Sequence, residues 1–499
     1  MQPDPSIFLR GIREDLLQTG NARLAEGDFV PGVTLLRGGE LLSHLMLRFE
    51  RLPALFDGFY PQQRALLERC ADQLAVFGIG VPPDVTTQLQ ADTACEDKVA
   101  RHDALAAAQS RCLFALSTRR DDPVVAKAMN ELMLAACQLD DDIRTARNQA
   151  LQEARDSGLP AVAADGVGVP DDALVTAWLR EHFPQYPDIR ASKVRQQKGV
   201  NTKEVFFMEL HGHPDWPAQA VMRRNRAVDT VGNEVSSEFG ILDYVHRHGV
   251  LAPRPLFAGA AMGEQKRPFV VLEKLDGRAQ GSAELGTETA RSVLLNLARN
   301  LARLHRVDVH GLPDAYRTYG KGASARQRTL AMIDRFYQLW QGDACEPSVV
   351  TESAYIWLRD NVDRVDDSLC IVHADYSLRN NLSRDGKATG ILDWELAHEG
   401  HPGEDLGYVR LDVEGVMPWS EFMQAYVEAG GFNVPDELIR YFHIYGLAFI
   451  MATLFTACNG YLTGRHADML IGGAGTIEFG IYEAMLAKAL LAEYQRSGD

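Results

Sequence analysis

Apolar residues recur three and four positions apart along the first third of the chain, from Ser6 to about Arg155. The spacing is clear in GGELLSHLMLRFERL, QQRALLERCADQLAVF and DPVVAKAMNELMLAACQL, and it is the period that places apolar side chains on one face of an α-helix. Turn signals separate these segments at GDFVPG, at Gly78 to Asp84 and at TRRDDP. Residues 1–155 are therefore predicted to form an all-α helical bundle domain, which contains no evident nucleophile or phosphate-binding loop.

The pattern changes twice after this region. Residues 156–171, DSGLPAVAADGVGVPD, are rich in Gly, Ala and Pro without a period and predict a linker. A short helix, DDALVTAWLREHF, precedes three predicted strands in KVRQQKGVNTKEVFFMEL, PAQAVMRRNR and RPFVVLEKL, with a helix NEVSSEFGILDYVHRHG before the last. We expect residues 172–280 to form a small β-rich lobe and residues 281–499 to form a mainly helical lobe.

Composition limits the classes of function. The 499 residues carry a formal net charge of −17, which disfavours nucleic acid as a partner. Seven cysteines, with no C-x-x-C pair, favour neither a zinc site nor a disulfide framework. The start of the chain, MQPDPSIFLRGIRE, lacks the pattern of a signal peptide, and Tyr441 to Cys458 is interpreted as a core helix rather than a membrane span. A cytoplasmic protein with no membrane partner is expected.

The segment from Ile371 to Asp405 carries the candidate chemistry. His373, Asp375 and Asn380 read H-x-D-x-x-x-x-N, and a short apolar run then ends at Asp393 in GILDWE. This order is typical of phosphoryl transfer, in which Asp375 would orient or deprotonate a substrate hydroxyl while Asn380 and Asp393 bind magnesium. We expect His373 and Asp405 to support the loop. Arg379 would place positive charge near the transferred phosphoryl group, or is an ordinary surface arginine.

The predicted small lobe supplies candidate nucleotide contacts. Asn201 and Thr202, in the loop GVNTK, would contact ATP phosphates, although the same loop is compatible with an ordinary hairpin turn. Arg223 stands where a kinase carries its phosphate-binding lysine, with Arg224 as the alternative. Glu238 is the preferred partner of Arg223, ahead of Glu234, and the backbone from Glu273 to Leu275 would read the adenine edge.

Together HADYSLRNNL, GILDWELAHEGHPGEDLG, VMRRNR and SEFGIL resemble the aminoglycoside phosphotransferase-like kinase family, from about Asp171 to the C-terminus. The string LDWELA, the Arg-Arg strand end and the segment YRTYGKGASARQRTLAMIDRFYQLWQ look most like the branch related to kinase domains fused to acyl-CoA dehydrogenases. The resemblance implies an α+β, two-lobed protein-kinase-like fold that uses ATP and Mg²⁺. Ala374 stands where the family usually has Gly, and His401 where it has a second Asp, and neither is a metal or base position.

Three functions fit these features. The preferred one is phosphorylation of a hydroxyl on a small molecule, with a hydroxyacyl-CoA as acceptor and four basic residues for its phosphates, namely Arg317, Lys321, Arg326 and Arg328. An aminoglycoside is the alternative acceptor, in a cleft lined with acids, namely Asp360, Asp363, Asp366, Asp367, Asp412 and Glu414. A nucleotide-binding pseudokinase or assembly module is the third, and the N-terminal helices offer a surface for homo-oligomerisation.

Overall fold

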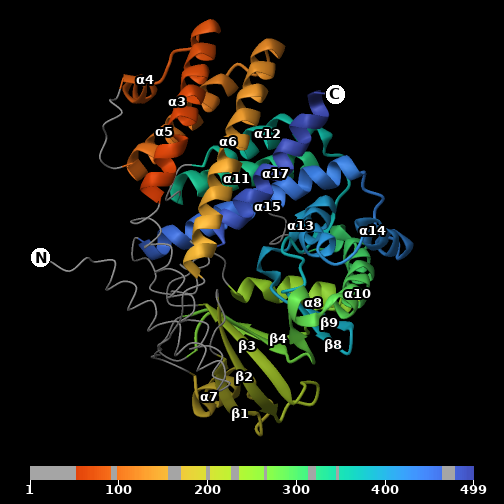
Figure 1. Cartoon of the computed structure of the whole chain (residues 1–499). Helices are drawn as coiled ribbons and strands as arrows, with labels where there is room; N and C mark the ends of the chain where they lie inside the picture. The colour runs from red at the N-terminus through yellow and green to blue at the C-terminus, as the bar shows by residue number, and fades with distance from the viewer. Residues whose placement is uncertain are drawn as a thin grey trace, which may run out of the picture. The chain divides into compact units, whose positions relative to one another are not determined.

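The computed structural model describes residues 52–90, 98–155, 170–197, 203–225, 235–262, 267–312, 322–343, 348–462 and 478–498 (Figure 1). Contacts between Cα atoms divide the chain into two compact units. The first comprises residues 1–164, 333–361 and 447–499, and the second comprises residues 165–332 and 362–446.

The first unit is built from helices in its described residues. They are α3 (Leu52–Val76), α4 (Pro83–Gln90), α5 (Lys98–Ser117), α6 (Pro123–Arg155), α12 (Val349–Asp360) and α17 (Phe479–Gly498), with the latter part of α11 (Ala325–Asp343) and of α15 (Asp436–Leu462). Helices α3, α5 and α6 pack on one another, and α12 contacts α5, α6 and α17. The predicted N-terminal bundle thus continues into helices from the C-terminal half.

Helix α12 explains why the units do not follow the order of the chain. The Ser348 hydroxyl caps its N-terminus by accepting a hydrogen bond from the Thr351 backbone N–H at 3.0 Å. Every residue from Val349 to Leu358 is buried, so this helix must be covered on all sides rather than along one stripe. We had predicted residues 281–499 as one lobe, whereas the contacts assign residues 333–361 and 447–499 to the unit that contains the N-terminal helices.

The second unit begins with a five-stranded antiparallel sheet in the order β1-β2-β3-β5-β4. Its elements are α7 (Asp172–His182), β1 (Arg190–Gln197), β2 (Lys203–His211), β3 (Gln219–Asn225), α8 (Glu238–Arg247), β4 (Pro255–Gly259) and β5 (Phe269–Glu273). Alternate residues of β2 are buried, as expected when a strand packs one face on a core. Trp178 of α7 stacks on Phe257 of β4 with ring centroids 5.3 Å apart. The predicted strands are present, and β4 was not predicted.

Helices and two small sheets form the rest of this unit. They are β6 (Arg278–Ala279), α9 (Ser282–Leu285), α10 (Thr287–His305), β7 (Cys370–Val372), β8 (Asn381–Arg384), β9 (Lys387–Ile391), β10 (His398–Gly400), α13 (Gly403–Glu414) and α14 (Trp419–Glu428). Strands β6, β8 and β9 form one sheet, and β7 pairs with β10. The predicted α+β architecture, with a sheet followed by a helical region, is confirmed.

The positions of the strands determine where the candidate catalytic and metal-binding residues lie. The loop with His373, Asp375 and Asn380 joins β7 to β8, and Asp393 is the second residue after β9. A glycine lets the presumed adenine-reading segment approach this region, because a Cβ at Gly390 would lie 2.3 Å from a methyl carbon of Leu275. Segments remote in the sequence therefore converge within the second unit.

One described helix is long and apolar enough to cross a membrane by length and composition. It covers Asp436–Gly460, and 78% of its most apolar window is buried within the protein. Such burial is typical of the core helix that we expected over Tyr441 to Cys458.

Candidate active site

The loop between β7 and β8 brings Asp375 and Asn380 into direct contact. The Asn380 amide nitrogen donates to an Asp375 carboxylate oxygen at 2.7 Å and to the Asp375 carbonyl at 3.0 Å. Burial raises the pKa of Asp375 to about 7, and the nearby Asp393 charge adds to this, while hydrogen bonds from Tyr408 and Asn380 oppose it. The two Asp375 oxygens accept from the amide nitrogen of Asn380, so its amide oxygen is left as a candidate metal ligand.

His373 connects this loop to the segment that carries Asp393. The Asp375 backbone N–H donates to His373 Nδ1 at 3.2 Å, so Nδ1 is the acceptor and Nε2–H donates to the Leu392 carbonyl at 2.9 Å. Burial lowers the pKa of His373, which favours the neutral ring that both contacts require. The Leu392 N–H also donates to the Asn380 carbonyl at 2.7 Å. The residues on either side of the predicted metal site are therefore cross-linked.

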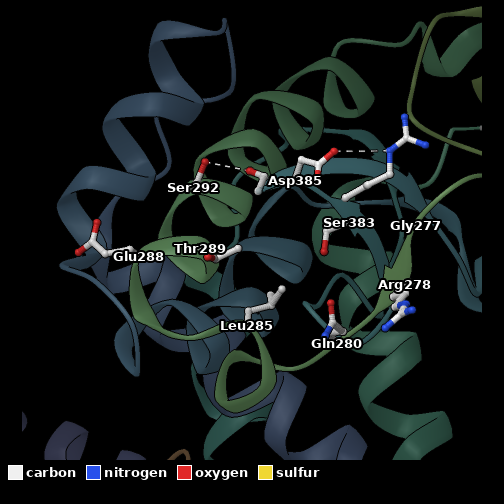
Figure 2. Close-up of a pocket in the computed structure, with 11 residues that line it drawn as sticks. Gly277, Arg278, Gln280, Leu285, Glu288, Thr289, Ser292, Ser383 and Asp385 are labelled. Atoms are coloured by element: carbon white, nitrogen blue, oxygen red, sulfur yellow. Dashed lines mark hydrogen bonds and ion pairs between the residues drawn. The ribbon is translucent and has the colours of Figure 1, made fainter.

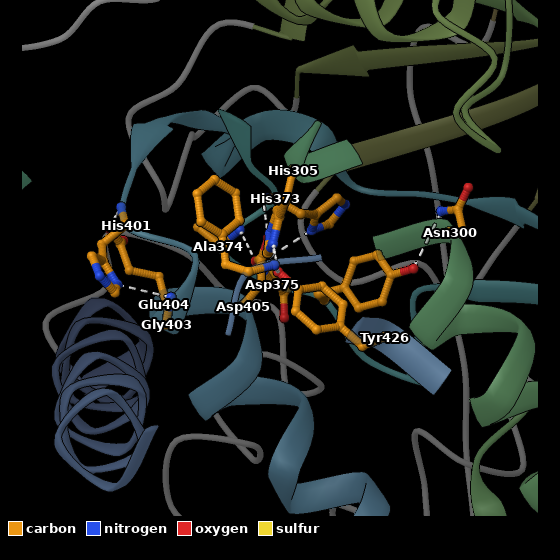
Figure 3. A network of polar contacts seen from close by, with 12 residues as sticks. Asn300, His305, His373, Ala374, Asp375, His401, Gly403, Glu404, Asp405 and Tyr426 are labelled. Atoms are coloured by element: carbon orange, nitrogen blue, oxygen red, sulfur yellow. Dashed lines mark hydrogen bonds and ion pairs between the residues drawn. The ribbon is translucent and has the colours of Figure 1, made fainter. Parts of the chain in front are cut away.

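Asp405, at the start of α13, holds the same loop from beneath (Figure 3). Its two carboxylate oxygens accept from the backbone N–H groups of His373 at 2.8 Å and Ala374 at 2.7 Å. Although burial would raise the pKa of Asp405, the hydrogen bond and charge of His305 lower it below its ordinary value. The His305 ring also contacts the Tyr426 hydroxyl at 2.7 Å, so the loop is anchored through α10 to α14.

Arg223 of β3 lies between two carboxylates. One guanidinium nitrogen donates to Glu238 of α8 at 2.5 Å, and another forms an ion pair with Asp393. The Glu238 side chain is 1% exposed, and burial raises its pKa to about 7 despite the positive charge of Arg223. Of the two glutamates proposed as partners, Glu238 makes the contact, and Glu234 lies outside the described residues.

A second buried ion pair, which sequence reasoning missed, joins the same region. The Lys203 ammonium at the start of β2 lies 3.3 Å from a carboxylate oxygen of Glu395, with the two side chains 0% and 9% exposed. Burial raises the pKa of Glu395, and the neighbouring Asp393 charge raises it further. Five charged residues from four segments thus form one cluster, namely Lys203, Arg223, Glu238, Asp393 and Glu395. The sequence signal was a lysine at the inward-facing end of a strand.

Comparison with known proteins locates this site within a family. The model of the phosphotransferase enzyme family matches residues 205–440, a range that contains every member of the charge cluster except Lys203. Over these residues the chain is similar to the phosphotransferase enzyme family. Acyl-CoA dehydrogenase family member 11 of Rattus norvegicus is 25% identical over 322 residues, which cover 60% of this chain and 40% of that protein. This chain therefore spans less than half the length of that curated relative.

Two further similarities concern phosphotransferases. Aminoglycoside 3'-phosphotransferase of Streptomyces fradiae is 25% identical over 255 residues, covering 48% of this chain and 89% of that protein. A crystal structure described as a putative aminoglycoside phosphotransferase from Ralstonia eutropha has a TM-score of 0.48 and 21% identity, and the match covers 63% of this chain and 98% of that one.

The oxygen ligands that this site offers suit magnesium. Mg²⁺ prefers oxygen ligands and is commonly held by one or two protein side chains together with water and substrate phosphates. Asn380 offers an amide oxygen, and the Asp393 carboxylate, 33% exposed, is open to the solvent on one side. The described residues contain no group of three or more His, Cys, Asp or Glu side chains arranged for a metal, so the magnesium would depend on these two ligands and the nucleotide.

The other predicted site residues differ in whether the structure describes them and in whether they lie near the charge cluster. Asn201 and Thr202 lie outside the described residues. Arg224 is not at the cluster, because its guanidinium pairs with Glu204 at 2.7 Å. Arg379 is exposed, and its positive charge lowers the pKa of Asp375. At the presumed adenine-reading segment, Glu273 accepts from the Arg254 backbone N–H at 2.8 Å through its side chain.

The two departures from the family pattern have local explanations. Ala374 has φ +65°, in the left-handed region that glycine adopts without strain, yet its N–H still reaches Asp405. His401 stacks on Phe442 with centroids 4.8 Å apart, and its Nδ1 accepts from the Gly403 N–H at 2.9 Å. Ala374 therefore stays bonded to Asp405, and His401 packs at the start of α13. Neither residue stands at a predicted catalytic or metal-binding position.

A cavity of about 670 Å³ lies apart from the residues of the charge cluster, none of which lines it (Figure 2). Its walls come from β6, the start of α10 and the β8–β9 turn, with Arg278, Thr289 and Asp385 among them. Ser292 closes one side by donating to the Gly386 carbonyl at 2.9 Å. Its lining mixes basic and acidic side chains, which gives no preference for the sign of a ligand.

Proposed function

We propose that this chain is an ATP- and magnesium-dependent phosphotransferase that phosphorylates a hydroxyl of a hydroxyacyl-CoA. The observation that carries the proposal is the cross-linked pair of segments that holds Asp375, Asn380 and Asp393 together. Asp375 would orient the acceptor hydroxyl and receive its proton. Magnesium bound by Asn380 and Asp393 would neutralise charge on the transferred phosphoryl group.

Arg223, on strand β3 of the five-stranded sheet, completes this arrangement. Its guanidinium has five N–H donors, so it can retain Glu238 and still offer donors to phosphate oxygens. Glu238 orients the arginine, and Lys203 with Glu395 supports the segment next to Asp393. In this proposal, these residues would position the nucleotide phosphates and one hydroxyl acceptor.

Two observations favour a hydroxyacyl-CoA as the acceptor. The Rattus norvegicus relative is named as a member of the acyl-CoA dehydrogenase family, and it matches a larger share of this chain than the Streptomyces fradiae aminoglycoside 3'-phosphotransferase does. In addition, acids that would have lined an aminoglycoside cleft are used within the protein: Asp412 accepts from the Leu378 N–H at 2.7 Å, and Glu414 pairs with Arg410 at 2.6 Å.

The basic residues first proposed for the CoA phosphates give less support. Arg328 is buried and pairs with Glu399 at 2.9 Å, and Arg326 pairs with Asp363 at 3.2 Å. Arg317 and Lys321 lie outside the described residues. Arg328 is therefore not available for CoA. For Arg317 and Lys321, contact with CoA phosphates stays a prediction.

An ADP-release screen tests the proposal by comparing hydroxyacyl-CoAs, the free hydroxy acids and aminoglycosides with the full chain. We expect magnesium-dependent turnover with a hydroxyacyl-CoA, its loss in Asp375→Asn, and retention in Asp367→Asn, which changes an exposed acid outside the cluster. Turnover with aminoglycosides alone would overturn the acceptor. ATP binding without turnover on any acceptor would favour the pseudokinase or assembly module instead.

A further inference from the structure

A pocket of about 460 Å³ in the second unit is lined by cationic side chains. They come from three elements: Arg299 and Arg303 from α10, Arg306 from the residue after it, and His248 from the turn that follows α8, with Val307 and Ala429 completing the lining. No acidic residue lines this pocket. In a protein with a net charge of −17, such a concentration of positive charge is unexpected.

The three arginines share one side of the chain at intervals of four and three residues. This spacing aligns side chains along one face of a helix and its last turn. All three are exposed, and within the described residues none of their guanidinium groups has a carboxylate within ion-pair distance. They differ in this from Arg247 of α8, which pairs with Asp243 at 2.9 Å.

Two contacts hold the arginines in the pocket. One nitrogen of Arg303 donates to the Gly249 carbonyl at 2.8 Å, and one of Arg299 donates to the Leu295 carbonyl at 3.1 Å. Arg306 lies against Gly430, where a Cβ would come within 2.5 Å of a guanidinium nitrogen. Because each guanidinium has five N–H donors, most of the donors of these arginines are not used by these contacts.

We propose that this pocket, defined by Arg299, Arg303, Arg306 and His248, is a second binding site for the phosphate groups of a small molecule. Planar guanidinium groups bind phosphate oxygens two at a time, and several of them together match a diphosphate better than a single carboxylate. The volume falls in the range of pockets for small ligands. A concave site of this size favours a small phosphorylated molecule over a membrane surface or a nucleic acid.

The site is separate from phosphoryl transfer. None of its residues belongs to the charge cluster or to the Asp375 loop, and its binding does not depend on the proposed function. Helix α8 carries Glu238 at its first residue and is followed by His248, so an occupant would contact the turn at the end of the helix whose first residue pairs with Arg223.

Inorganic pyrophosphate is the probe, titrated calorimetrically into the full chain in EDTA, where binding through magnesium is suppressed. We expect saturable binding near one equivalent and at least a tenfold loss of affinity in Arg299→Gln/Arg303→Gln. Arg306→Gln tests the site without removing a described side-chain hydrogen bond and should also weaken binding. Arg247→Gln is the matched control, and it should bind as the wild type does.

Two arms identify the source of the phosphates. Displacement of pyrophosphate by CoA points to the acceptor and displacement by ATP points to the donor, and either supports the site. The proposal is overturned if the wild type shows no saturable binding in EDTA, or if both the Arg306→Gln and the double variant bind like the control. Binding of anionic vesicles or of an acidic peptide without binding of pyrophosphate would also overturn it.

Discussion

Replacement of Lys203 by Met tests whether the buried pair with Glu395 supports the site. Methionine keeps the length and apolar stem of lysine but removes the ammonium, leaving the Glu395 carboxylate without its partner at 3.3 Å. Removing one member of a buried ion pair typically costs about 3–5 kcal/mol, because the remaining charge is uncompensated. The second unit contains about 250 residues, for which a loss of 1 kcal/mol lowers Tm by about 2 °C.

We therefore expect Lys203→Met to lower the Tm of the second unit by about 6–10 °C. Differential scanning calorimetry of the full chain measures this shift and separates transitions if the two units unfold independently. Adding Glu395→Gln removes the uncompensated charge as well, so Lys203→Met/Glu395→Gln should recover at least half of the loss. Lys193→Met is the control, since that lysine pairs with Glu209 while 73% exposed and such pairs contribute about 1 kcal/mol or less.

The argument would be refuted by a shift below about 2 °C for Lys203→Met, or by a double variant that is no more stable than the single one. Either result would mean that Glu395 finds another partner or that the cavity left by lysine dominates. The first alternative predicts full activity in the single variant, because the segment after Asp393 would keep its position.

Three other predictions address the loop, the first unit and the chemistry. Ala374→Gly should raise stability by about 1 kcal/mol, since glycine adopts φ +65° without a Cβ clash; a lower Tm with unchanged loop hydrogen exchange would contradict this. Burial raises the pKa of Glu352 to about 7, so the stability that this group contributes falls as pH rises from about 4.5 to 7. Urea unfolding should therefore show Glu352→Gln to be more stable than the wild type by up to about 3 kcal/mol at pH 8, and equal to it near pH 4. Asp375→Asn should reduce phosphoryl transfer at least about 100-fold while ATP affinity, measured by calorimetry, changes little, and a comparable loss of affinity would place Asp375 in nucleotide binding instead.

Local sequence determined much of the fold because the relevant signals are short-range. Alternation in β2 and the three- and four-residue spacing in α3 and α6 each lie within one element, and the predicted architecture is confirmed there. His373, Asp375 and Asn380 lie within one loop, so their proximity follows from their spacing in the sequence. Strand β4 was missed because Pro255 begins it and only five residues form it.

Contacts between residues that are far apart in the sequence could not be predicted in the same way. Lys203 and Glu395 are far apart in the sequence, and neither lies in a motif that marks it as paired. Asp412 was assigned to a possible acidic cleft, but it accepts the Leu378 N–H, because a helix acid next to a tight loop satisfies a backbone donor. Which acid meets which donor depends on the register between elements, and a single sequence does not specify it.

The interleaved composition of the first unit has a consequence for its synthesis. Helices α3, α5 and α6 leave the ribosome early, but their partners α12 and α17 are separated from them by the whole small sheet, and α17 ends at residue 498. Since domains generally fold during synthesis in order of their appearance, the early helices must wait for the last one with apolar faces uncovered. Removal of the first 155 residues would likewise uncover α12 rather than release an independent kinase, so a shortened chain is expected to depend on chaperones or to aggregate.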